Sequence, residues 1–272
     1  MKRELDATLR RTLSPGIYHK AITTWRARLY WQESIASIFI KRTPDVLGYP
    51  SDQAELPNQL REVNVLAPTQ MCRTMHRTGS DKSLHWHNYT TIYNALLAKL
   101  RNMPLRILEI GLGSNDTSLT SNMSAYGVPG ASLRGWRELF PNAQIFGADI
   151  DRKCLFQEDR IRTTYCDQLD VNAIREMWSQ PGFQDDMDLI IEDGLHTFEA
   201  NTIFLKESLG HLRPGGIYTT EDIASNTLPQ WQNLLSGDLP AQFPNHEFAL
   251  VRLPNPRNPN DNNMLIVRKL VT

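Results

Sequence analysis

The sequence has 272 residues, enough to bury a large core as one domain or as a domain with an appendage. Its formal net charge of -1 argues against nucleic acid or an acidic membrane surface as a partner, and no apolar run approaches the roughly 18 residues of a membrane span. We therefore expect small-molecule partners.

The cysteines bear on the compartment. Cys72, Cys154 and Cys166 are odd in number, lie far apart and lack CxxC spacing, which fits reduced thiols better than a disulfide framework or a zinc site. The first residues, MKRELDATLRRTLSPG, lack the apolar core of a signal peptide. A cytoplasmic protein is therefore expected.

The first 70 residues differ in texture from the rest of the chain. Residues 25–40, WRARLYWQESIASIFI, have the spacing of an amphipathic helix. Residues 43–70 contain several prolines and few periodic apolar residues, which predicts a loop or linker. We assign residues 1–70 to a helical N-terminal appendage with a linker, and residues 71–272 to the main domain.

From residue 104 onward, short apolar runs alternate with segments of helical spacing. The runs are RILEI, QIFGADI, RIRTTYC, DLIIED and GGIYTTED, and the segments between them include SLRGWRELF, VNAIREMW and FEANTIFLKESL. This alternation predicts an α/β fold with a mostly parallel, Rossmann-like sheet and helices on both faces. EFALVRL and NMLIVRKL have no helical segment between them, so we expect an antiparallel pair at one edge.

Three strand ends carry groups suited to a nucleotide. Glu109 and Gly111 lie at the end of the first run, although a glycine turn alone is nearly as compatible with ordinary turn geometry. Asp149 ends the second run, where an acid binds ribose hydroxyls, and Asp167 with Gln168 follows the third, where adenine would lie. A dehydrogenase would require GxGxxG, but Asp116 takes the last position. The pattern therefore favours S-adenosylmethionine over a dinucleotide.

Acidic residues end the next two strands. Asp193 with His196 follows one, and Glu221 with Asp222 follows the other. If the strands are neighbours, these carboxylates converge and favour a hard ion such as Mg²⁺, although turn capping is an alternative. His196 has the side chain of a general base, which would take the proton of a metal-bound hydroxyl as that oxygen attacks the methyl group.

Several motifs together resemble the Mg²⁺-dependent sugar O-methyltransferases that act on macrolide antibiotics of the mycinamicin and tylosin type. They are RTGSDKSLHWHNYTTIY, LEIG, PGASLRGWRELFP, FGADID, DQLD, IIEDGLH and RPGGIYTTED, within residues 77–223. The resemblance implies a class I methyltransferase fold and S-adenosylmethionine as donor. It also implies cofactor contacts at Thr78, Asp81 and Ser132, a metal set of Asp193, Glu221 and Asp222, and His196 as the base. Trp86, Tyr89 and Tyr93 are candidates for a lid or an acceptor wall.

The sequence departs from this family pattern in two places. The family runs almost directly from LEIG into the helix that begins near Ser132, whereas this chain carries a polar insertion, residues 114–129. We expect the insertion to close over donor or acceptor, with more effect on acceptor use. The family's D-D-x-S-H is E-D-G-L-H here, so Glu192 replaces an aspartate and Leu195 a serine. The acceptor therefore need not be an antibiotic sugar.

The sequence thus predicts a Mg²⁺-dependent O-methyltransferase that methylates a hydroxyl of a sugar in a glycosylated natural product or glycan. One alternative is the same chemistry on a phenolic or polyketide hydroxyl in secondary metabolism. Another is a non-catalytic binding protein with the same fold. By analogy with the family we also expect a homo-oligomer.

Overall fold

The computed structural model describes residues 41–48, 55–83, 86–124 and 127–271, together with residues 12–14, 17, 21 and 24. Its strands are β1 (Asp45–Gly48), β2 (Arg106–Ile110), β3 (Gln144–Asp149), β4 (Gln157–Glu158), β5 (Ile161–Tyr165), β6 (Met187–Glu192), β7 (Leu212–Thr220), β8 (His246–Arg252) and β9 (Asn263–Lys269). Its helices include α3 (Glu55–Arg61), α4 (Gln70–Thr78), α5 (Tyr89–Leu97), α6 (Ala131–Leu139), α7 (Val171–Ser179), α8 (Phe198–Ser208), α9 (Leu228–Ser236) and α10 (Asp238–Gln242). None of these described helices is long and apolar enough to cross a membrane.

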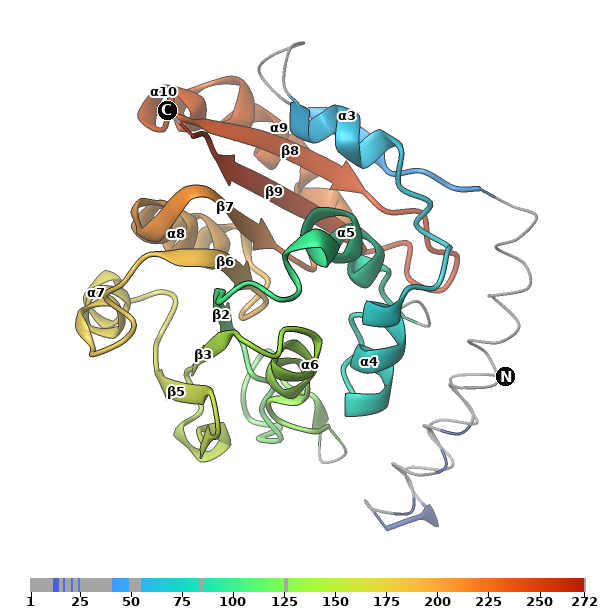
Figure 1. Ribbon diagram of the computed structural model, residues 1–272, viewed down its shortest axis with the longest axis vertical. Helices are drawn as coiled ribbons and strands as arrows, with labels where there is room; N and C mark the ends of the chain where they lie inside the picture. Colours follow the sequence, from blue (N-terminus) through green and yellow to red (C-terminus); the bar gives the residue numbers. More distant parts are fainter. Residues whose placement is uncertain are drawn as a thin grey trace.

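All of the described strands belong to one sheet with the order β1-β8-β9-β7-β6-β2-β3-β5-β4. The five central strands β7, β6, β2, β3 and β5 run parallel, and β9 pairs antiparallel with both β7 and β8. The expected parallel sheet and antiparallel pair are therefore confirmed. Figure 1 shows the sheet with its flanking helices.

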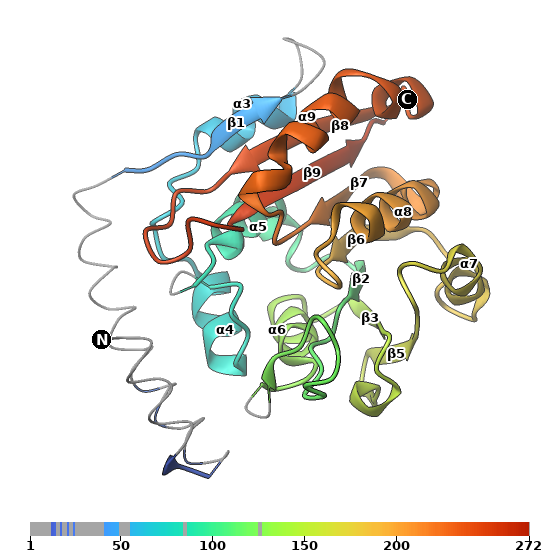
Figure 2. The same ribbon diagram turned by 180° about the vertical axis from the view of Figure 1, so that it is seen from behind.

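The two faces of the sheet form two separate cores. Alternate residues of β2 point to opposite faces, so Ile107 packs with α3, α4, α5 and α6, whereas Leu108 and Ile110 pack with α7, α8 and α9. Figures 1 and 2 show these two helical layers from opposite sides. Because strands covered on both faces are buried throughout, their sequences are continuous apolar runs rather than alternating ones.

The region before residue 70 differs from the expected linker. β1 pairs with β8 and extends the sheet beyond the antiparallel pair, and α3 buries Leu56 and Leu60 against the core. Both elements are short; β1 follows Pro44, and α3 contains Pro57. Their apolar spacing was therefore not recognisable from the sequence. Residues 43–70 are therefore not a linker throughout, while the helix expected over residues 25–40 lies outside the described residues.

The sheet topology fixes where a ligand would bind. β2 has β3 on one side and β6 on the other, so the chain winds outward in opposite directions from β2. Ligands of open α/β sheets bind beyond the carboxyl ends of the strands at such a switch point. The segments that follow β2, β3, β5, β6 and β7 all meet there, and they carry most of the predicted site residues.

Candidate functional site

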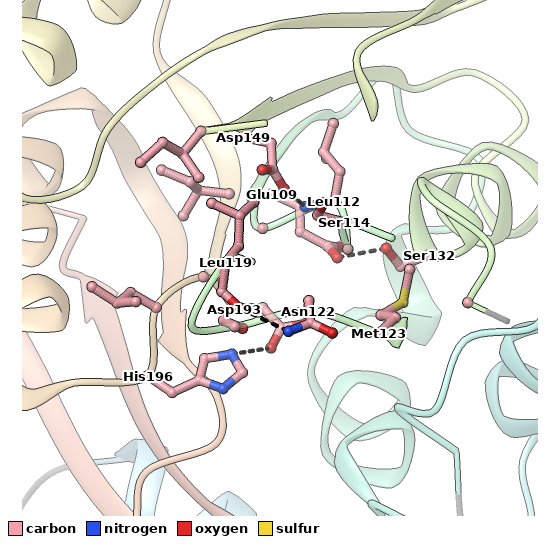
Figure 3. A pocket seen from close by; sticks show the side chains of 18 of the residues that line it. Glu109, Leu112, Ser114, Leu119, Asn122, Met123, Ser132, Asp149, Asp193 and His196 are labelled. Carbon is pink, nitrogen blue, oxygen red and sulfur yellow. Dashed lines mark hydrogen bonds and ion pairs between the residues drawn. The ribbon is translucent and has the colours of Figure 1, made fainter. Parts of the chain in front are cut away.

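A cavity of about 640 Å³ opens at the carboxyl ends of the parallel strands. This volume lies within the range of ligand pockets, about 300–1,000 Å³. The predicted site residues that line it are Asp81, Glu109, Gly111, Ser132, Asp149, Asp167, Gln168, Asp193, His196 and Asp222. Thr78 and Glu221 do not line it. Figure 3 shows one part of this cavity, with Glu109, Asp149, Asp193 and His196 labelled.

The glycine turn after β2 contacts Asp193 on one side and Asp149 on the other. Gly111 has φ +90°, and a Cβ atom there would overlap the carbonyl oxygen of Asp193, so only glycine fits. Leu112 N donates to Asp149 Oδ2 at 2.7 Å, and Asp151 N donates to Asp149 Oδ1 at 2.8 Å. These bonds hold Asp149 at the cavity wall, with a further lone pair on each carboxylate oxygen for a ligand.

Glu109 is a buried carboxylate that accepts hydrogen bonds from two residues of α6. Ser132 Oγ donates to its Oε1 at 2.5 Å, Trp136 Nε1 donates to its Oε2 at 2.6 Å, and only 1% of its surface is exposed. Burial raises the pKa of this carboxyl, although Lys82 opposes the rise. Glu109 therefore ties the start of α6 to β2, and Ser132 turns its hydroxyl toward Glu109.

Gln168 joins two strand ends to each other. Its Nε2 donates to Glu192 Oε1 at 2.8 Å, and its Oε1 accepts from Leu195 N at 2.8 Å. A Cβ at Gly194 would overlap the Gln168 amide oxygen. Glu192, one of the two departures from the family motif, and Gly194, at the variable position of that motif, are thus both matched to Gln168.

Two apolar side chains stand at the cavity beside the polar strand ends. Ile150 follows Asp149 and Leu169 follows Gln168; each is 47% exposed, and both line the cavity. Large apolar side chains left open in a concave site are typical of ligand contact surfaces. They offer flat apolar area for a nucleobase, next to the carboxylate of Asp149.

Opposite this nucleotide-like half lies an acidic corner. His196 Nε2 lies 3.3 Å from Asp193 Oδ1, and His196 Nδ1 lies 3.6 Å from Asp222 Oδ2. Candidate ligand atoms of these three residues lie within 4.8 Å of one another. His196 and Asp222 have φ of +61° and +52°, a conformation unusual for residues other than glycine. Strained backbone of this kind is concentrated at functional sites.

The charges in this corner control the state of His196. Burial alone would lower the pKa of the imidazole, but the carboxylates of Asp193, Asp222 and Glu192 together raise it to about 10. His196 therefore holds its proton at neutral pH when only protein charges surround it. It is free to accept a proton there only when the neighbouring carboxylates are neutralised.

Lys82 is a site residue that the sequence analysis missed. Its ammonium group forms ion pairs with Asp193 and Glu221 and lies 3.5 Å from Glu109 Oε1, with a side chain only 2% exposed. It comes from the TGSDK segment, in which only Thr78 and Asp81 were singled out. A lysine next to an aspartate in the sequence is usually solvent-exposed. No local sequence pattern indicates that the Lys82 side chain is buried.

The structure separates Glu221 from the other predicted metal ligands. Its Oε1 accepts from Tyr93 Oη at 2.5 Å, its Oε2 accepts from Lys82, and it is 1% exposed. Tyr89 Oη donates to Asp222 Oδ1 at 2.7 Å. Tyr89 and Tyr93, considered above for a lid or wall, are buried and support the two acids.

Thr78 lies at the end of α4, away from the cavity lining. Its hydroxyl donates to Met75 O at 3.1 Å, and the helix ends at Gly79, which has φ +97°. Asp81 is exposed and lines the cavity. Of the two cofactor contacts implied for the TGSDK segment, only Asp81 therefore reaches the cavity.

The chain is similar to several enzymes of antibiotic pathways, although no protein-family model matches it. It is 32% identical over 170 residues to 8-demethyl-8-(2-methoxy-alpha-L-rhamnosyl)-tetracenomycin-C 3'-O-methyltransferase of Streptomyces olivaceus, covering 60% of this chain and 41% of that protein. It is 35% identical over 144 residues to demethylmacrocin O-methyltransferase of Streptomyces fradiae, covering 52% of this chain and 32% of that protein. The match thus spans less than half the length of either relative.

A solved structure shows the same architecture. MycE methyltransferase from the mycinamycin biosynthetic pathway, in complex with Mg, SAH and mycinamycin VI, superposes with a TM-score of 0.56 at 25% identity, over 80% of this chain and 59% of that one. The chain has the class I methyltransferase fold. Both the fold class and the resemblance to macrolide sugar O-methyltransferases expected from the motifs are confirmed.

Within this fold the cavity lies where the class binds its ligands, at the carboxyl ends of β2, β3, β5 and β6. The glycine turn, Asp149 and the apolar pair Ile150 and Leu169 form one half of it. We call this the donor half. The acidic corner of Asp193, His196 and Asp222 forms the other.

Proposed function

We propose that this chain transfers a methyl group from S-adenosylmethionine to a hydroxyl of a sugar, with Mg²⁺ held in the acidic corner. The observation that carries the proposal is that the donor half and the acidic corner line one cavity. A donor and a metal-bound acceptor would therefore meet without any rearrangement of the sheet. Such positioning accounts for much of the rate enhancement of a group transfer.

The donor half suits S-adenosylmethionine in shape and chemistry. Gly111 lets the ligand approach the backbone closely, Asp149 offers carboxylate oxygens to ribose hydroxyls, and Ile150 with Leu169 offers apolar surface to adenine. Asp167 and Asp81 also line the cavity. We propose Asp149 and Asp167 as polar contacts of the donor, with Glu109, Ser132 and Gln168 holding the walls in place.

The acidic corner suits a hard cation. Lys82 forms ion pairs with Asp193 and Glu221 and lies near Glu109, so it offsets part of the negative charge of these carboxylates. Asp193 and Asp222 are partly exposed at the cavity and offer oxygen ligands, the type that Mg²⁺ prefers. Bound there, Mg²⁺ would make a coordinated hydroxyl more acidic. For Glu221 to complete the predicted metal set, its carboxylate must exchange Lys82 or Tyr93 for the ion.

His196 is the proposed proton acceptor. It lines the cavity between Asp193 and Asp222, whose charges otherwise keep it protonated. Neutralisation of these carboxylates lowers the pKa of the imidazole toward its ordinary value of about 6.5, where it accepts a proton at neutral pH. The same two aspartates thus orient the ring and set its charge.

The class of acceptor rests on the relatives. Their names describe methylation of rhamnosyl tetracenomycin, demethylmacrocin and mycinamicin VI, all glycosylated small molecules. We propose a sugar hydroxyl by this similarity, and a phenolic or polyketide hydroxyl is the second candidate. A non-catalytic role is disfavoured because the acidic corner and donor half are both intact. A homo-oligomer also remains a prediction, which light scattering tests.

The proposal is tested by methyl transfer from labelled S-adenosylmethionine to a panel of sugars, glycosides and phenols, with Mg²⁺ or with chelator. Transfer to glycosides that requires Mg²⁺ supports it, and transfer to phenols alone selects the second candidate. Calorimetry with S-adenosylmethionine and NAD separates the donor classes. Tight NAD binding without any response to S-adenosylmethionine would overturn the proposal.

A further inference from the structure

The insertion, residues 114–129, is tied to the donor half by its own hydrogen bonds. Its two ends meet where Gly130 N donates to Leu112 O at 2.8 Å, and Met123 N donates to Ser114 O at 2.8 Å. The Asn115 amide donates to Ser124 O at 2.5 Å and to Gly127 O at 3.2 Å. The described part of the insertion is thus a compact loop held by hydrogen bonds between its own residues.

Two further contacts fasten this loop to the segment after β3. Ser114 donates its hydroxyl to Asp151, and Asp116 Oδ2 accepts from Lys153 Nζ at 2.9 Å. Hydrogen bonds from Ser118 lower the pKa of Asp116, and the ion pair with Lys153 lowers it further. The segment after β3 directly follows Asp149, the last residue of β3 and the proposed ribose ligand. The insertion is therefore anchored to the donor half in two places, at Leu112 in the glycine turn and at the segment after β3.

Met123 fills the space that two glycines leave open. A Cβ atom at Gly113 would overlap the Met123 methyl group and sulfur, and a Cβ atom at Gly127 would overlap the Met123 Cβ. Gly113 has φ +82° and belongs to the glycine turn of the donor half. Met123 also lines the cavity, and Figure 3 labels it together with Ser132 and His196, which line the same cavity.

We propose that Met123 is an apolar wall of the donor pocket, which covers bound S-adenosylmethionine or its product and slows its release. This inference rests on the donor class given under the proposed function. Methionine is apolar, flexible and polarizable, so it adapts to a ligand while excluding water. The contact at Gly113 assigns the Met123 part of the insertion to the donor, where the sequence had led us to expect the larger effect on the acceptor.

The experiment compares S-adenosylhomocysteine binding to unaltered protein, Met123→Leu, Met123→Ala and the control Met103→Ala. Met103 is 49% exposed and lies just before β2, at the end of the sheet opposite the cavity. We expect Met123→Ala to weaken binding about ten- to hundredfold through faster dissociation, because one apolar wall is lost. Met123→Leu should bind within about threefold of the unaltered protein, since it keeps the volume, and Met103→Ala should not differ from it.

A second measurement needs no substitution in the protein tested. In unaltered protein labelled at the methionine methyl carbons, the Met123 resonance should shift when S-adenosylhomocysteine is added, and the Met103 resonance should not. Met123→Leu serves only to assign the signal. If S-adenosylhomocysteine does not bind the unaltered protein, the proposed function fails. If it binds but neither the Met123 signal nor the affinity of Met123→Ala changes, the assignment of Met123 alone is overturned.

Discussion

Lys82 and Glu221 form an ion pair shielded almost completely from water, with side chains 2% and 1% exposed. Lys82 comes from the segment between α4 and α5, and Glu221 follows β7. The same ammonium group pairs with Asp193 after β6. One cation therefore links the helical layer to two strand ends, and it sets how much negative charge remains for a metal ion.

Replacing Lys82 by methionine should destabilise the protein strongly. It leaves Glu109 and Glu221 buried without their cation, a loss of about 3–5 kcal/mol by the measure of other broken buried pairs. Urea denaturation measures this loss. The double variant Lys82→Met with Glu221→Gln should recover part of it, because one of the unpaired charges is removed as well. An unchanged midpoint for Lys82→Met would show that these contacts carry little of the stability.

Asp193→Asn should abolish Mg²⁺-dependent methyl transfer while leaving donor affinity nearly unchanged. The substitution removes one charged oxygen from the acidic corner but touches no group of the donor half. Binding of Mn²⁺, followed by electron paramagnetic resonance, should weaken in parallel. The control is Asp159→Asn, whose side chain is 87% exposed. Full activity of Asp193→Asn in excess chelator would contradict the metal role.

The stability of the metal-free protein should depend on His196 through pH. The carboxylates around His196 raise its pKa to about 10 against burial, from about 6.5 in the unfolded chain. Because the pKa is higher in the folded protein, protonated His196 stabilises the fold. This stabilisation is fully present below pH 6.5 and is lost as the pH rises toward 10. In chelator, the difference in unfolding free energy between unaltered protein and His196→Gln should shrink over this range. A difference that stays constant would mean that His196 does not carry the charge.

Much of the fold follows from the sequence because its strands are buried on both faces. Runs such as RILEI and DLIIED, spaced by helical segments, admit few arrangements other than a parallel sheet. Strand order then brings Asp149, Asp193 and Asp222 to one edge. These three side chains were predictable because each lies at the end of a strand or within two residues after it.

The remaining features depend on long-range contacts that leave no local pattern. Lys82 is adjacent in sequence to Asp81, yet its partners lie after β6 and β7. The amide N–H and the amide oxygen of Gln168 form hydrogen bonds with Glu192 and Leu195, because the turn after β6 lies beside Gln168. They therefore do not both face the donor. β1 was missed because a strand as short as Asp45–Gly48 shows no periodicity in the sequence. It is defined by its pairing with β8.

Gly111→Ala should disrupt the site far more than the matched change Gly210→Ala. At Gly111 the new methyl group would meet the backbone carbonyl of Asp193, and φ is +90°, whereas a Cβ at Gly210 has no atom within 4 Å. Backbone strain of this kind costs about 1–3 kcal/mol, and displacement of Asp193 should weaken Mn²⁺ binding as well. Urea denaturation and Mn²⁺ titration of both variants measure these effects. Equal behaviour of the two variants would show that the turn after β2 adapts freely and does not fix the acidic corner.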